Sequence, residues 1–296
     1  MNRRTAGGTA MARLSFWKMS GSGNDFILVD NRRGAVPAGE GPALARRLCA
    51  RGFSVGADGL ILLERSREAD FAWRFYNADG SEAAMCGNGG RCAARFAFLR
   101  KIAPARMRFL TGAGPIRAEV RGDRVKLELP PPSGYRERVP VDIADRPVEA
   151  GFVVVGVPHA VLHAESLESV PVAEWGRPLR HHAAFGPAGA NVNFFRVEGP
   201  RALRVRTYER GVEGETHACG TGSVATSLVA AAAGLVASPV TVTTSGGEKL
   251  KVHFRRRGDR FTEVFLEGGA DVVYEGRMWE GPAAPARAKR PLREGR

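Results

Sequence analysis

"MCGNGGRCAARFAF" at residues 85–98 and "ACGTGSVATSLVAA" at residues 218–231 follow one pattern. Each stretch has a cysteine, then a Gly-x-Gly turn, then a run of apolar and small residues with helical periodicity. The pair predicts two helices that begin directly after Cys86 and Cys219. A thiol at each helix start then needs an explanation.

The residues around these two stretches repeat as well, which indicates an internal duplication. "SGSGNDFILVD" (20–30) and "AGANVNFFRVE" (188–198) share a Gly-rich turn, an Asn, a Phe and a following strand. In each half, a later strand ends in a tyrosine. Tyr76 precedes Cys86 by 10 positions, and Tyr208 precedes Cys219 by 11. "ELPPPSGY" (128–135) is the predicted linker between two halves built on one plan.

Strand patterns outnumber helix patterns, so the predicted fold class is α+β. Helical patterns occur at 41–52 and in the two runs that follow the cysteines. The predicted strands are 25–30, 59–64, 71–77, 124–130, 151–157, 191–197, 202–209, 240–246, 250–254 and 261–268.

The formal net charge of +13 is concentrated at the two ends of the chain. Residues 1–13 contribute +3 and residues 281–296 contribute +4, and both segments are predicted to be disordered basic tails. The rest has no basic stripe interleaved with aromatic residues, so we predict no nucleic-acid partner. No apolar run predicts a membrane span or a secretory signal, and we expect a cytoplasmic protein with reduced cysteines.

Two thiols at opposed helix starts would suit proton exchange at a carbon atom. A helix start offers free backbone N–H groups and the positive end of the helix dipole, so it attracts a carboxylate and should lower the pKa of a thiol. If the carboxylate belongs to an amino acid, one thiolate takes the α-proton and the opposite thiol returns a proton to the other face. The stereocentre is then inverted without any cofactor.

Five blocks of this sequence together resemble the diaminopimelate epimerase family: "KMSGSGNDFILVDN", "FYNADGSEAAMCGNGGRC", "GVPHAV", "GANVNF" and "YERGVEGETHACGTG". The resemblance covers residues 14–280 and implies interconversion of LL- and meso-2,6-diaminopimelate for lysine and peptidoglycan precursor synthesis. It implies two pseudo-symmetric domains, 14–131 and 132–269, with a strand near 270–280 as a candidate to return to the first. Each would wrap a mostly antiparallel sheet around a central helix, with the site in the cleft between them, and the protein would be a homodimer.

The resemblance also implies roles for individual residues. Cys86 is the expected proton donor and Cys219 the expected acceptor, with the roles exchanged in the reverse direction. His159 and Glu209 are expected to influence the thiols. The residues expected to bind substrate are Asn24, Asn77, Gly87, Asn88, Asn191, Glu209, Arg210, Gly220 and Thr221.

Two positions depart from the family's usual pattern: Val157 replaces a frequent Asn, and Gly59 replaces a frequent Gln. Both concern the far end of the substrate, so another two-cysteine amino-acid racemase, of the proline type or other, is an alternative. A non-catalytic thiol redox or binding protein is a second alternative. No metal site is predicted, because no Cys-x-x-Cys pair occurs, and Cys49 and Cys92 are expected to be buried packing residues.

Overall fold

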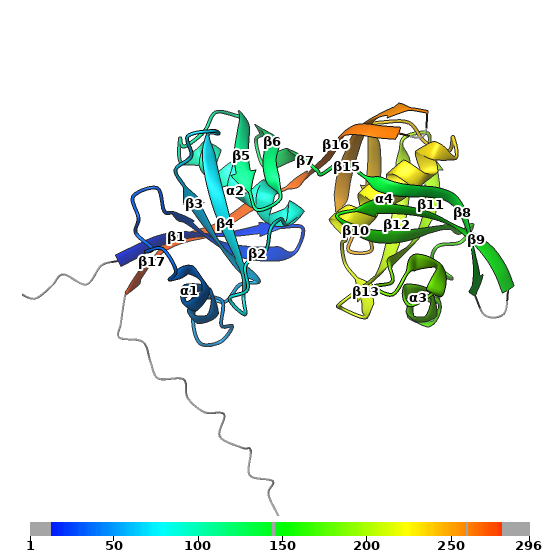
Figure 1. Cartoon of the computed structure of the whole chain (residues 1–296), viewed down its shortest axis with the longest axis horizontal. Helices are drawn as coiled ribbons and strands as arrows, with labels where there is room; N and C mark the ends of the chain where they lie inside the picture. Colours follow the sequence, from blue (N-terminus) through cyan, green and yellow to red (C-terminus); the bar gives the residue numbers. More distant parts are fainter. Residues whose placement is uncertain (1–12, 144–145, 259, 280–296) are drawn as a thin grey trace, which may run out of the picture.

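The computed structural model describes residues 13–143, 146–258 and 260–279 and has two lobes (Figure 1). The basic tails predicted at 1–13 and 281–296 lie outside these ranges, apart from the backbone of Arg13. The described residues form four α-helices, one 3-10 helix and seventeen strands, all of the strands in one continuous hydrogen-bonded sheet. The predicted α+β class is confirmed.

The N-terminal lobe consists mainly of a sheet that surrounds one helix, α2. Pairing is antiparallel for β1–β2, β3–β4, β5–β6 and β6–β7, and parallel for β2–β3 and β4–β5, where α1 and α2 make the crossovers. The elements are β1 (Arg13–Gly21), β2 (Asn24–Asp30), α1 (Gly41–Leu48), β3 (Gly59–Glu64), β4 (Phe71–Asn77), α2 (Gly87–Leu99), β5 (Arg106–Thr111), β6 (Gly114–Arg121) and β7 (Arg124–Glu128).

The C-terminal lobe repeats this order of pairing around α4. Pairing is antiparallel for β8–β9, β9–β10, β11–β12, β14–β15 and β15–β16, and parallel for β10–β11 and β12–β14, across α3 and α4. The elements are β8 (Ser133–Ile143), β9 (Arg146–Val155), β10 (Val157–His163), α3 (Val172–Arg180), η1 (Ala183–Phe185), β11 (Asn191–Gly199), β12 (Ala202–Glu209), β13 (Gly214–Thr216), α4 (Gly220–Ala232), β14 (Val240–Thr243), β15 (Lys249–Arg257) and β16 (Arg260–Gly269).

Two strand pairings join the lobes. β16 pairs antiparallel with β7, so that Leu266 lies opposite Leu127. The last strand, β17 (Asp271–Trp279), then crosses to the N-terminal lobe and pairs antiparallel with β1 (Figure 1). The first and the last strand that the structure describes therefore lie in the same lobe.

Each central helix is buried by its sheet because its sequence is apolar or small on nearly every side. In α2, Cys92 is fully buried and Phe96 is 2 % exposed, both within the apolar core of the N-terminal lobe. α4 is rich in Ala and Ser and lies close to the strand backbone. A Cβ atom at Gly151 of β9 would stand 2.4 Å from Cγ1 of Val229, so only glycine fits there. Cys49 is also buried, and packing is confirmed for both additional cysteines.

Most of the predicted strands match observed ones, with one error at residues 151–157. Gly156 has φ of +70°, in the left-handed region that glycine tolerates, and it divides this segment between β9 and β10. Eight further elements were not predicted from the sequence: β1, β5, β6, β8, β10, β13, α3 and η1. Among the residues that the structure describes, no helix combines the length and the apolar composition needed to cross a bilayer.

Candidate active site

Both cysteines occupy the N-cap position of a central helix. Cys86 has φ −146° and ψ 121°, and its Sγ accepts a hydrogen bond from the backbone N–H of Gly89 at 3.4 Å. Cys219 has φ −122° and ψ 108°, and its Sγ accepts from the N–H of Gly222 at 3.3 Å. Each sulfur therefore replaces the Ser or Asp oxygen that commonly caps a helix.

The two helix starts approach each other from opposite lobes. α2 and α4 are in contact, and Oδ1 of Asn88 lies 3.8 Å from the place that a Cβ atom would take at Gly220. A Cβ atom at Gly222 would stand 2.4 Å from Oδ1 of Asn193, so the turn after Cys219 requires glycine. The duplicated Cys-Gly-x-Gly turns thus bring free N–H groups of both lobes to one place.

The pKa values of both thiols lie above the ordinary value. Burial raises the pKa of Cys86, although hydrogen bonds from the backbone N–H groups of Gly89 and Asn88 act in the opposite direction. Burial, and after it the charge of Glu209, raises the pKa of Cys219 to about 12. The expected lowering by the helix starts is therefore wrong here. A helix dipole contributes only about 0.3–1 kcal/mol in most settings, and desolvation of the thiolate outweighs it.

His159 is linked to the second cysteine turn through Asn193, and it is neutral. It is fully buried, and burial, together with the charge of Arg210, lowers its pKa to about 3. Its Nδ1 contacts Nδ2 of Asn193 at 3.2 Å, and Nε2 has no hydrogen-bond partner. Asn193 also donates to the carbonyl of Ala160 at 3.0 Å and accepts from Thr207 at 3.0 Å.

The amides expected to bind substrate have several different contacts. Asn191 is 3 % exposed, and its Oδ1 accepts from the backbone N–H of Arg210 at 2.8 Å, so it holds the turn that carries Arg210. Asn77 donates through Nδ2 to Oγ of Ser81 at 2.9 Å, within a tight turn. Glu209 ends β12 on the side of Cys219, and burial raises its pKa.

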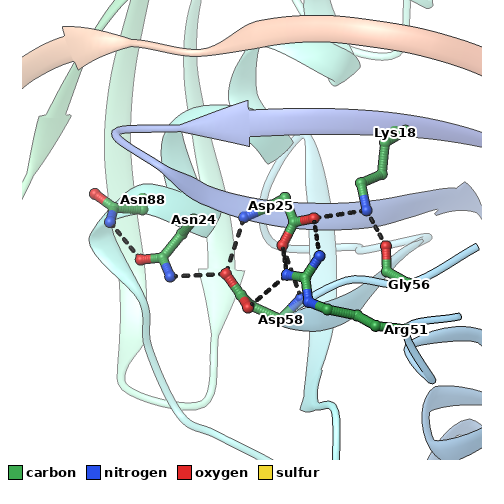
Figure 2. A network of polar contacts seen from close by, with 7 residues as sticks. All are labelled: Lys18, Asn24, Asp25, Arg51, Gly56, Asp58 and Asn88. Carbon is green, nitrogen blue, oxygen red and sulfur yellow. Dashed lines mark hydrogen bonds and ion pairs between the residues drawn. The ribbon is translucent and has the colours of Figure 1, made fainter. Parts of the chain in front are cut away.

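Asn24 and Asn88 belong to a polar network on the N-terminal lobe (Figure 2). Asn88 donates through Nδ2 to Oδ1 of Asn24 at 2.6 Å. Asn24 donates through Nδ2 to Oδ2 of Asp58 at 3.0 Å. Side chains thereby connect the regions where α2, β2 and β3 begin. Asp58 was not predicted from the sequence as a site residue.

Charged residues complete this network behind Asp58. Asp25 forms ion pairs with Lys18, at 2.7 Å, and with Arg51, whose guanidinium also contacts Asp58 at 2.9 Å. Lys18 is 6 % exposed and also donates to the carbonyl of Gly56. Burial alone would raise the pKa of Asp25, but hydrogen bonds from Arg51 and Lys18 outweigh it and hold that pKa at about 2.

A second polar chain passes from one lobe to the other. Arg91 of α2 is fully buried, donates through Nε to the carbonyl of Gly269 at 3.1 Å, and donates to Oγ of Ser22. Ser22 in turn donates to Oε1 of Glu248, in the turn before β15, at 2.7 Å. The β1–β2 turn of one lobe is thus tied to the β14–β15 turn of the other.

The two departures from the family pattern have different surroundings. A Cβ atom at Gly59 would stand 2.5 Å from Cε2 of Phe75 and 2.8 Å from the carbonyl of Tyr76, so a larger residue has no room. Val157 begins β10 opposite Val155 and is partly exposed. Within the described ranges, no group of three or more His, Cys, Asp or Glu side chains is arranged to hold a metal ion.

Comparisons with known proteins identify the family. A family model described as diaminopimelate epimerase matches residues 16–132 and 151–273. The chain belongs to the diaminopimelate epimerase family. A diaminopimelate epimerase of Aquifex aeolicus is 45 % identical over 282 residues, which is 90 % of this chain and 98 % of that protein. One from Archaeoglobus fulgidus is 40 % identical over 279 residues, covering 89 % and 96 %.

Solved structures with low sequence identity share the fold of this family member. A phenazine biosynthesis protein of the PhzF family from Bacillus anthracis has a TM-score of 0.69 at 14 % identity, over 90 % of this chain and 99 % of that one. A probable proline racemase from Agrobacterium radiobacter has a TM-score of 0.64 at 17 % identity, over 92 % and 94 %. These likenesses concern the arrangement of the elements alone.

Proposed function

We propose that this chain is a cofactor-independent epimerase that interconverts LL- and meso-2,6-diaminopimelate, in the synthesis of lysine and peptidoglycan precursors. The observation that carries the proposal is the pair of cysteine-capped helix starts, one from each lobe, that meet at Asn88 and Gly220. Membership of the diaminopimelate epimerase family supports the choice of substrate.

The proposed reaction exchanges one proton on each face of the α-carbon. The substrate carboxylate would accept hydrogen bonds from the backbone N–H groups that begin α2 and α4, including those of Gly87, Gly220 and Thr221. The Cys219 thiolate would take the α-hydrogen as a proton, and the N–H groups would stabilise the negative charge left on the substrate. The Cys86 thiol would then give its proton to the opposite face of the carbon, so that the proton count is unchanged.

The raised thiol pKa values set a requirement for this mechanism. With both sulfurs protonated at neutral pH, the Cys219 thiol must release its proton to water before the first transfer. The ammonium group of the amino acid would supply the neighbouring positive charge that favours a thiolate. Glu209 would discourage the same ionisation, and neutral His159 would add no charge. The substrate would therefore generate its own base, and the free thiols would remain unreactive.

The remaining expectations belong to the same proposal. Asn24, Asn77, Asn88, Asn191 and Arg210 would hold the substrate, in the cleft between domains 14–131 and 132–269. The return of β17 to β1 supports assigning residues 271–279 to the first domain. We also propose that the protein forms a homodimer, as the family resemblance implies, and that it is located in the cytoplasm.

Deuterium incorporation tests the reaction and the two cysteines together. The chain is incubated with LL-diaminopimelate in heavy water under reducing conditions, and we expect meso product with deuterium at the inverted carbon. Cys86→Ser and Cys219→Ser should each reduce turnover by at least about 100-fold, because each removes one of the two acid/base groups. Cys92→Ala is the matched control, because this buried thiol lies on α2 away from its start, and it should retain activity.

The alternatives give different results in the same experiment. A wild-type chain without exchange would refute the epimerase. A panel of amino acids separated by chiral chromatography would reveal a racemase of the proline type, whose fold this chain shares. A thiol redox or binding protein would keep its function in both serine variants, or change only in redox state.

A further inference from the structure

The hydrogen bonds between Asp58, Asn24 and Asn88 have a direction (Figure 2). A carboxylate only accepts hydrogen bonds, whereas an asparagine amide has a donating and an accepting side of nearly the same shape. Asp58 therefore requires the Nδ2 side of Asn24, which places Oδ1 of Asn24 toward Asn88. Asn88 must then turn its own Nδ2 toward Asn24 and its oxygen away.

Asp58 is itself held so that this direction cannot reverse. Its Oδ2 also accepts from the backbone N–H of Asp25 at 3.1 Å, and its backbone N–H donates to Oδ1 of Asp25 at 3.1 Å. Arg51 donates to its Oδ1 at 2.9 Å. Every hydrogen-bond partner of the Asp58 carboxylate is a donor, so both of its oxygens act as acceptors.

The far end of the chain of hydrogen bonds reaches the second lobe. Oδ1 of Asn88 is the atom 3.8 Å from the Cβ position at Gly220, beside the start of α4. This acceptor oxygen thus lies close to the start of α4, whose first backbone N–H groups have no partner within the helix. In an amino acid the carboxylate and the ammonium group share one carbon, so a site that binds both needs donors and an acceptor side by side.

We infer that Asp58 is a positioning residue that fixes the direction of hydrogen bonding through Asn24, so that Asn88 presents its carbonyl oxygen to the ammonium group of a bound amino acid. The inference rests on the proposed function, since it describes how the same site selects an α-amino acid. Asp58 acts through the two amides and does not itself contact the substrate.

Two substitutions at Asp58 separate its acceptor oxygen from its charge. Asp58→Ala removes both, so Asn24 and Asn88 can take either orientation. Asp58→Asn loses the charge but keeps an oxygen at the Oδ2 position, because the N–H of Asp25 favours an acceptor there. Both variants lose the ion pair with Arg51 and should lose similar amounts of thermal stability.

We expect Asp58→Ala and Asp58→Asn to differ in their kinetic constants although their thermal stabilities are similar. Asp58→Ala should lower kcat/KM by about 10- to 100-fold, the range for loss of a hydrogen bond to a charged group. Most of this change should be in KM, because the ammonium group is bound in both the ground state and the transition state. Asp58→Asn should stay within about threefold of the wild type. Equal losses in both variants, or an Asp58→Ala value within about twofold of wild type, would overturn the inference.

Glu119→Gln is the matched control for loss of a carboxylate charge. Glu119 accepts from Arg121 at 2.7 and 3.0 Å, on β6 and away from both helix starts, and its amide variant should keep kcat/KM within about twofold. If Asp58→Ala does not fold, Asp58→Leu removes the acceptor while filling more of the space.

Hydrogen exchange of side-chain amides in the wild-type protein gives a reading that needs neither substrate nor variants at Asp58. Asn24 and Asn88 each donate one hydrogen of their NH2 groups, so these should exchange at least about tenfold more slowly than in free asparagine. The signals are assigned by their loss in Asn24→Asp and Asn88→Asp. Exchange of both amides at the rate of free asparagine would refute the hydrogen-bonded chain from Asp58 through Asn24 to Asn88. Slow exchange of the amides, together with no deuterium incorporation into diaminopimelate, would refute only the epimerase activity.

Discussion

Gly222→Ala should damage the second cysteine turn more than any surface change of the same size. The added Cβ atom would stand 2.4 Å from Oδ1 of Asn193 and 3.1 Å from Sγ of Cys219. Asn193 is fully buried, and its amide is held by the carbonyl of Ala160 and by Thr207, so it can move only by breaking those bonds.

The expected cost follows from these contacts. Overpacking typically costs about 1–3 kcal/mol. One buried hydrogen bond left unmade adds about 1–3 kcal/mol. The higher helix propensity of alanine relative to glycine stabilises the folded state by about 1 kcal/mol. The net expectation is a loss of about 1–5 kcal/mol in the free energy of unfolding, with a fall in epimerase turnover because Sγ of Cys219 is displaced.

Urea denaturation at 25 °C measures the loss, and Gly269→Ala is the control. Gly269 has no atom within 4 Å of its Cβ position and does not have the left-handed φ that favours glycine. Its variant should lie within about 0.5 kcal/mol of wild type, as do most substitutions away from packed sites. A Gly222→Ala protein as stable as Gly269→Ala would show that the turn after Cys219 has room for a side chain, and the reasoning would be wrong.

Three further predictions concern titrating groups. The pKa of His159 in the folded protein is lowered to about 3, so only the unfolded chain binds a proton at this residue as the pH falls from about 6.5 to 3. The free energy of unfolding should therefore decline by up to about 1.4 kcal/mol per pH unit in that window. In urea titrations at several pH values, His159→Gln should flatten this slope, and an unchanged slope would refute the prediction. The pKa of Asp25 is lowered from 3.8 to about 2 in the folded protein. Its contribution to stability is therefore present above pH 3.8 and lost as the pH falls through about 2. The melting temperature of Asp25→Asn should vary less with pH across that window than that of the wild type, and equal variation would contradict the prediction. The charge of Glu209 contributes to the raised pKa of the Cys219 thiol. Glu209→Gln should therefore speed alkylation of Cys219 by iodoacetamide at pH 7.5, as measured by mass spectrometry of the peptide that contains Cys219. A rate equal to or below that of the wild type would show that Glu209 does not raise this pKa.

Much of the fold can be predicted from local sequence patterns, such as apolar runs and glycine turns. The apolar run of β3 and the duplicated helix starts were predicted because burial on both faces, and a glycine turn before a small-residue helix, leave distinct patterns. β8 was missed because its outer face carries charged residues and a proline. α3 was missed because Pro178 interrupts its helical pattern. Neither has a strong local signal, and both are stabilised by contacts with distant segments.

The candidate site divides in the same way. Cys86 and Cys219 were singled out because each sits beside glycine in a repeated motif. Asp58 and Arg51 were not, because a carboxylate in a turn and an exposed arginine resemble ordinary surface residues. Only the folded chain brings Asp58 into contact with Asn24, and Arg51 into contact with Asp58. Asn193 had a usable signal, since it lies two positions after Asn191 on the same face of β11. The pKa direction of the thiols was predicted wrongly because the extent of burial is a tertiary property.

The pairing of β17 with β1 affects the order in which the chain can fold during synthesis. β1 lies between β2 and β17, and Gly276 of β17 packs against the ring of Phe16. While the ribosome is still making the C-terminal lobe, β1 is an open edge with an apolar side chain exposed, a form prone to pairing with other chains. The N-terminal lobe is therefore completed last although it is made first.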